Sequence, residues 1–117
     1  MTKIDDETRL HHMLDAAREA SLFIQGKTRE SLNTERMLAL SLVRLLEIIG
    51  EAASRVSKEK QERIPEIPWR QMIGMRNRLT HAYFDINLDF VWQTVTEDLV
   101  PLIAQLEKIL SEGYDNS

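Results

Sequence analysis

The segment from Arg76 to Tyr83 concentrates side chains that are suited to phosphate chemistry. It reads Arg-Asn-Arg-Leu-Thr-His-Ala-Tyr, so it offers two guanidinium groups, an amide, an imidazole and a phenol. Arginine carries a permanently charged fork of donors for phosphate oxygens, and histidine exchanges a proton near neutral pH. No Asp or Glu occurs from Ile67 to Phe84. The sequence therefore predicts a local anion site in a protein of net charge -4.

A helix from Trp69 to about Ala82 is expected to position these side chains. At helical spacing its apolar residues would face the core, and they are Met72, Met75, Leu79 and Ala82. The opposite side would carry polar residues, namely Arg70, Asn77 and His81 with Arg78 beside them. A neighbouring strip would carry Arg76, Thr80 and Tyr83.

The residue types in this helix suggest roles for three side chains. Arg76 would bind phosphate and stabilise its charge. Asn77 would lie one turn from His81, so its amide could orient the imidazole for general acid or base catalysis. The alternative is an ordinary solvated helix face that binds nothing.

The remaining chain shows the apolar periodicity of helices and lacks the alternating pattern of strands. Helices are expected over residues 6–25, 33–57, 69–82 and 88–110, with a short helix or a charged continuation over residues 58–63. This pattern predicts an all-α, up-and-down bundle of four to five helices. The second helix is apolar over an arc wide enough for two packing surfaces. Pro101 should kink the last helix because it removes one backbone hydrogen bond.

Length and composition indicate one globular domain spanning residues 1–117, with an ordered core of about residues 5–112. The absence of cysteine excludes disulfides, thiolate metal sites and a cysteine nucleophile. The first residues lack the apolar run of a signal peptide, and no stretch has the length and apolarity of a membrane span. A cytoplasmic protein is expected. Its pI near 5.4 argues against nonspecific coating of nucleic acid.

No metal and no organic cofactor are predicted. Glu47 and Glu51 lie one turn apart on the second helix, but no histidine or third acid accompanies them at ligand spacing. Structural pairing with neighbouring arginines is the preferred interpretation. Trp69 and Trp92 could stack on bases, although packing is the commoner role at their positions. A glycine-rich phosphate loop is missing, which excludes a nucleotide-hydrolysing site of that type.

The string from Arg76 to Tyr83 matches R-x4-H-x-Y, the motif of HEPN-domain ribonuclease toxins of the HepT type. Asn77 directly follows the motif arginine, as in that family. Three further segments resemble the family in order and spacing, and they are residues 46–52, 64–70 and 74–77. The resemblance covers about residues 5–112 of the chain.

The resemblance implies an all-helical homodimer whose two motifs meet in one cleft and which cleaves RNA without a metal ion. The ribose 2′-hydroxyl would attack the adjacent phosphate, with one His81 as base and the partner's copy as acid. Both Arg76 side chains would stabilise the phosphorane, and the product would end in a 2′,3′-cyclic phosphate. Arg70 and Arg78 are expected to bind the RNA, which could be a transfer or messenger RNA.

The resemblance also implies that the chain is the toxin of a HepT/MNT pair, a type VII-like toxin-antitoxin system. A cognate minimal nucleotidyltransferase antitoxin would add AMP to Tyr83 and silence the ribonuclease. Tyr83 could instead be structural. Two other interpretations remain. The chain could be a noncatalytic subunit that presents RNA or a nucleotide to the nucleotidyltransferase, or a purely structural helical dimer. The complete set of Arg76, Asn77, His81 and Tyr83 favours the ribonuclease.

Overall fold

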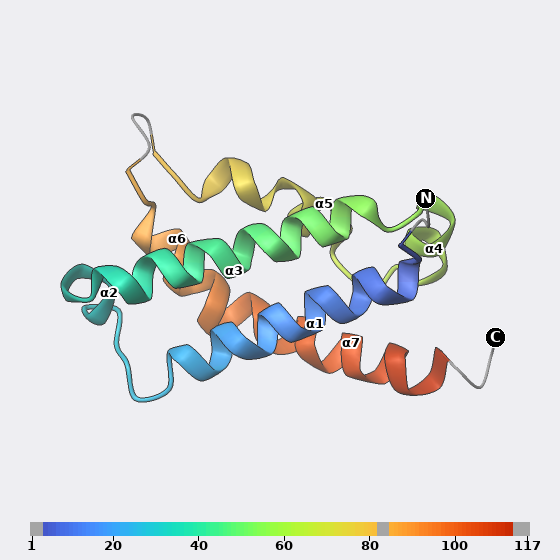
Figure 1. Cartoon of the computed structure of the whole chain (residues 1–117), viewed down its shortest axis with the longest axis horizontal. Helices are drawn as coiled ribbons and strands as arrows, with labels where there is room; N and C mark the ends of the chain where they lie inside the picture. The colour runs from blue at the N-terminus through green and yellow to red at the C-terminus, as the bar shows by residue number, and fades with distance from the viewer. Residues whose placement is uncertain (1–3, 82–84, 114–117) are drawn as a thin grey trace.

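The chain folds into helices, as a computed structural model that describes residues 4–81 and 85–113 shows (Figure 1). In chain order they are α1 (Asp6–Phe23), α2 (Ser31–Thr34), α3 (Arg36–Arg55), α4 (Lys58–Arg63), α5 (Trp69–Ile73), the 3₁₀ helix η1 (Gly74–Arg78), α6 (Leu88–Gln93), the π-helical segment η3 (Thr94–Asp98) and α7 (Leu99–Gly113). Within the described ranges there is no strand, only an isolated bridge between Thr80 and Ile86. The all-α prediction is confirmed.

The long helix α3 lies at the centre of the bundle. Figure 1 shows α1 and α3 side by side in opposite directions, with α5 and η1 along the other side of α3 and α7 beside α1. Leu42, Leu46 and Ile49 of α3 are fully buried between these neighbours. No helix in the described part of the chain has both the length and the apolarity needed to cross a membrane.

The starts of α1 and α6 follow from local capping. The Asp5 carboxylate accepts a hydrogen bond from the backbone N–H of Thr8 at 2.8 Å, and this bond lowers the pKa of Asp5. Asn87 caps α6 by accepting from the N–H of Phe90 at 3.1 Å. After α1 the chain turns through Gly26, whose φ of 74° lies in the left-handed region that suits glycine.

The predicted second helix, residues 33–57, is interrupted at Glu35. The backbone of Glu35 leaves the helical region (φ -115°, ψ 86°), so α2 and α3 are separate helices. The break allows Leu32 of α2 to be buried and lets Glu35 pair with Lys27 at 2.8 Å. At the other end Ser57 accepts from the N–H of Lys60 at 3.2 Å and starts α4, so residues 58–63 form a short helix of their own.

The predicted last helix, residues 88–110, contains a wide turn ahead of Pro101. Residues Thr94–Asp98 form the π-helical segment η3 between α6 and α7. Pro101 has no N–H to donate to the carbonyl one helical turn earlier, which belongs to Glu97 within this segment. The π turn therefore contains the carbonyl that Pro101 cannot bond, as expected where the regular helical bonding pattern is broken.

Gly50 allows the motif-bearing segment to pack closely on α3. A Cβ added at Gly50 would lie 3.0 Å from the backbone oxygen of Met72 and 4.0 Å from Cγ of Arg76. A helix-interior glycine costs about 1 kcal/mol relative to alanine, so its presence here indicates a close approach of two backbones. Gly50 thus determines how near α5 and Arg76 lie to α3.

Replacing Gly50 by alanine is expected to lower the free energy of unfolding by about 1–3 kcal/mol, because the overpacked α5 backbone must move. Gly74→Ala is the matched control, since a Cβ there meets no heavy atom within 4 Å. That control should be neutral or stabilising by up to about 1 kcal/mol. Urea denaturation of both variants measures the difference. Equal stability of the two variants would contradict the steric role of Gly50.

Candidate functional site

The helix that carries the motif is shorter than predicted. α5 continues into η1, which ends at Arg78, and the expected helix to Ala82 is wrong over residues 79–81. Leu79 is buried, and Thr80 pairs with Ile86 across an antiparallel bridge. The carbonyl of Leu79 accepts from the N–H of Asn87 at 2.8 Å. This loop pairing replaces the helical bonds that the sequence pattern predicts.

Because His81 lies on this loop, it is not placed one helical turn beyond Asn77. The backbone N–H of His81 donates to the carbonyl of Asp85 at 2.6 Å, so His81 lies on the loop, beyond the helix. No hydrogen bond joins the Asn77 amide to the His81 imidazole, and both residues are exposed. Asn77, Thr80 and His81 are weak helix formers, which explains why tertiary pairing prevails over the helix here. The predicted one-turn spacing of Asn77 and His81 is therefore wrong.

Arg76 lines a cavity of about 340 Å³ between η1 and α3. Its other lining residues are Arg44, Glu47 and Glu51, all on α3. Glu51 accepts a hydrogen bond from Arg55 at 2.8 Å, and Arg44 and Glu47 form an ion pair at 3.9 Å. Structural pairing of the two acids, as predicted, is what the structure contains. The cavity of the motif arginine thus holds two positive and two negative groups.

The Glu51 carboxyl is ionised at neutral pH. Its bond to Arg55 and the charge of Arg55 hold its pKa below the ordinary value and outweigh the opposing effect of desolvation. The charges of Arg76 and Arg9 add still smaller effects that also lower this pKa. Arg9 lines an adjoining cavity of about 110 Å³ that shares Arg44 and Glu51 with the first. The two cavities form a charged surface that runs from η1 to α1.

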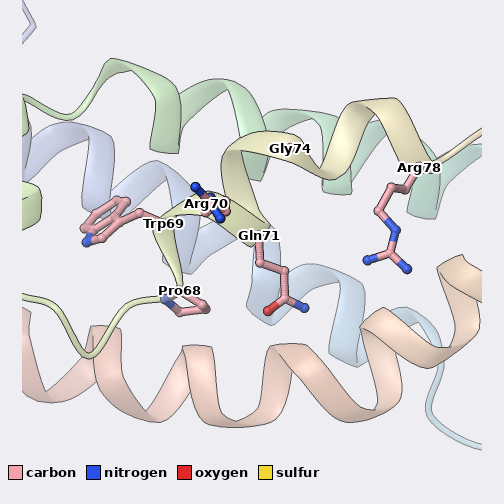
Figure 2. A pocket seen from close by; sticks show the side chains of 6 residues that line it. All are labelled: Pro68, Trp69, Arg70, Gln71, Gly74 and Arg78. Carbon is pink, nitrogen blue, oxygen red and sulfur yellow. The ribbon is translucent and has the colours of Figure 1, made fainter.

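Arg70 and Arg78 line a different and larger cavity, of about 560 Å³. It is lined by Pro68, Trp69, Arg70, Gln71, Gly74 and Arg78 (Figure 2). Arg78 is held with its guanidinium carbon 4.5 Å from the centre of the Phe90 ring on α6, a cation–π contact. The arginines of this segment are therefore divided between two cavities, with Arg76 alone facing α3.

The remaining predicted residues lie outside both cavities. Asn77 and His81 are exposed and line neither the Arg76 cavity nor the larger one. Tyr83, the predicted acceptor of AMP, falls outside the described residues. Among the residues that are described, no three His, Cys, Asp or Glu side chains are grouped as a metal site would require. Within one protomer, Arg76 lines a cavity whose lining does not include His81.

Comparison with known proteins agrees with the resemblance carried by the motif. Residues 13–109 match the family model described as "Ribonuclease HepT-like". The "Probable ribonuclease HepT" of Thermococcus cleftensis is 37% identical over 100 residues, which cover 82% of this chain and 91% of that protein.

Two further relatives cover similar shares of the chain. The "Putative RNase MJ1380" of Methanocaldococcus jannaschii is 32% identical over 107 residues, covering 92% of this chain and 98% of the relative. The "Putative RNase TTE0752" of Caldanaerobacter subterraneus is 33% identical over 103 residues, which cover 88% of this chain and 92% of that protein. No solved structure matches the chain. The motif, the helical fold and these matches together establish that the chain belongs to the HepT-like ribonuclease family.

Proposed function

We propose that this chain is a metal-independent endoribonuclease of the cytoplasm, active as a homodimer. The observation that carries the proposal is the intact R-x4-H-x-Y motif within the part of the chain that matches the ribonuclease family, with Arg76 on a cavity wall. Relatives at 32–37% identity are named as ribonucleases. The exposed imidazole of His81 is free to meet a substrate.

The proposed reaction is transesterification within the RNA strand. The ribose 2′-oxygen forms a bond to the adjacent phosphorus while the bond from phosphorus to the 5′-oxygen breaks. One imidazole accepts the 2′-hydroxyl proton, and a second, protonated imidazole donates to the leaving 5′-oxygen. The guanidinium of Arg76 stabilises the charge on the phosphorane. The products are a 2′,3′-cyclic phosphate and a free 5′-hydroxyl.

The dimer supplies the second imidazole, because the motif holds one histidine per chain. A groove of about 420 Å³ between α1 and α3 is suited to a second copy, with Phe23 and Leu40 on its walls. These two side chains are 39% and 46% exposed, and the nearby Met37 is 84% exposed. Arg44 lines both this groove and the Arg76 cavity. A partner seated in the groove would therefore lie next to the motif arginine.

Cleavage of RNA is the direct test of the proposal. Total RNA incubated with the protein should yield fragments with 2′,3′-cyclic phosphate and 5′-hydroxyl ends, identified by enzymatic end labelling. EDTA should leave the rate unchanged, since no step needs a metal ion. Fragments that end in a 3′-hydroxyl, or a reaction that stops in EDTA, would contradict the mechanism. Intact RNA would favour the second candidate, a noncatalytic RNA-binding subunit of a nucleotidyltransferase complex.

In the cell we propose that the ribonuclease is the toxin of a toxin-antitoxin pair and is silenced by a minimal nucleotidyltransferase. The phenol oxygen of Tyr83 would attack the α-phosphorus of ATP, lose its proton and release pyrophosphate. The resulting nucleotide would add negative charge and bulk two residues from His81, where RNA phosphate must enter.

Replacing Tyr83 by phenylalanine should prevent the modification while part of the cleavage activity remains, because only the acceptor oxygen is lost. The measurement is intact mass after incubation with the nucleotidyltransferase and ATP. Tyr114→Phe is the matched control, since Tyr83 and Tyr114 are the two tyrosines of the chain. The control should gain one or more AMP groups. A gain of AMP by Tyr83→Phe would count against Tyr83 as the acceptor.

A further inference from the structure

Several side chains that line the cavity of Arg70 and Arg78 are positioned by contacts with residues of other elements. Three of its side chains have fixed partners. The Trp69 indole N–H donates to the carbonyl of Ile64 at 3.1 Å, and Gln71 donates to Asp98 at 3.0 Å. Arg78 rests on the Phe90 ring. Such preorganised side chains lose little further freedom when a ligand binds.

The lining has the chemistry of a site for an aromatic anion. It contains two guanidinium groups, one indole and no carboxylate, whereas the Arg76 cavity contains two carboxylates. Figure 2 shows the side chains of Arg78 and Gln71 pointing in the same direction, with Trp69 at the opposite end of the row from Arg78. Arg70 is exposed and has no ion-pair partner among the residues that the structure describes. Its guanidinium is available to a phosphate.

The volume of the cavity, about 560 Å³, is within the range of small-molecule sites and large enough for a nucleotide. An indole offers a face or edge to a base, and a guanidinium binds phosphate oxygens through paired donors. The Arg76 cavity, by contrast, is smaller and has balanced charges. The two cavities differ in size, charge and aromatic content, so they suit different parts of a substrate.

We propose that the Trp69, Arg70 and Arg78 cavity binds one nucleotide, base and phosphate together, away from the bond that is cleaved. The inference rests on the proposed function in that the nucleotide belongs to the RNA substrate. A free mononucleotide offers the same chemistry and is the other source. In either case Arg70 and Arg78 bind a nucleotide that does not react, while Arg76 and His81 act on the scissile phosphate.

Fluorescence of Trp69 tests the proposal without any need for cleavage. The protein would carry Trp92→Phe, so that Trp69 is the remaining tryptophan, and His81→Ala, so that RNA stays intact. A five-nucleotide RNA and adenosine 5′-monophosphate are titrated separately. Arg70→Gln should weaken the binding of the ligand by about tenfold, as expected for one lost charge-assisted contact. Arg36→Gln, a change at an exposed arginine on α3, is the matched control and should bind as before.

The two ligands distinguish the sources of the nucleotide. Saturable quenching by the oligomer, with adenosine 5′-monophosphate much weaker, assigns the cavity to the RNA chain. Quenching by adenosine 5′-monophosphate that the oligomer does not displace assigns it to a free nucleotide. Unchanged fluorescence with both ligands, or equal binding by Arg70→Gln and Arg36→Gln, overturns the proposal. Binding that depends on Arg70 in a protein that cleaves no RNA would refute the proposed function and leave this inference intact.

Discussion

The His81→Ala variant is expected to cleave RNA about 10²–10⁴ times more slowly than the unaltered protein. This is the range for removal of a group that acts as general acid or base, and two such groups in a dimer lead toward its upper end. The fold should be unaffected, because the His81 side chain is exposed. Initial rates on a labelled RNA give the ratio, and the circular dichroism spectrum reports the helix content.

The chain provides a matched control in His11→Ala. His11 lies on α1 and its imidazole is 4.0 Å from the Glu7 carboxylate, a weak surface contact. This variant should cleave at nearly the rate of the unaltered protein. A His81→Ala variant that keeps more than about a tenth of the activity would exclude His81 from acid or base catalysis.

Helix positions were largely predictable because apolar periodicity depends on short-range spacing. The first helix is expected over residues 6–25 and occurs at Asp6–Phe23. The wide apolar arc expected of the second helix corresponds to buried side chains of α3 such as Leu42 and Ile49. The break at Glu35 was not predicted, because the sequence continues in a helix-compatible pattern across it. The burial of Leu32 and the ion pair of Glu35 with Lys27 accompany the break, and both involve contacts that helical periodicity does not reveal.

The geometry of the site was less predictable, because it depends on contacts between distant segments. Residue types indicated a phosphate-handling segment, and the family match agrees with the predicted ribonuclease class. The end of the helix before His81 depends on the pairing of Thr80 with Ile86, which periodicity does not reveal. Likewise, the contact of Arg78 with Phe90 directs this arginine into the larger cavity, away from Arg76.

Two residues near the site, Gly50 and Trp69, carry a structural signal in their residue type and position. Gly50 interrupts a strongly helical run, where a glycine is costly unless a backbone must approach closely. The approach is that of the Met72 carbonyl. Trp69 follows Pro68 at a position where packing is the commoner role, yet it is only partly buried and also lines the largest of the cavities described above. An aromatic beside arginines could have indicated a second binding site.

Leu40→Glu is expected to separate the proposed dimer and to lower RNA cleavage at least about 10²-fold, because each monomer then holds a single imidazole where the proposed reaction uses two. Leu40 is 46% exposed on the wall of the groove, so glutamate can be solvated there in the monomer but not against a partner. Sedimentation velocity measures the mass, and initial rates measure the activity. Val100→Glu, at a 60% exposed apolar residue on α7, should remain dimeric and active. A monomeric Leu40→Glu protein with full activity would refute the shared site.

Mixing subunits separates a shared site from two independent ones. When one part of active protein exchanges with nine parts of His81→Ala protein, most active chains acquire an inactive partner. If both imidazoles serve one reaction, the activity per active chain should fall to about one-tenth, because only about one-tenth of those chains still pair with each other. If each chain is a complete catalyst, the activity per active chain stays constant. Among the described residues, the cavity of Arg76 is lined by α3 side chains and not by His81 of the same chain, so the first outcome is the expected one.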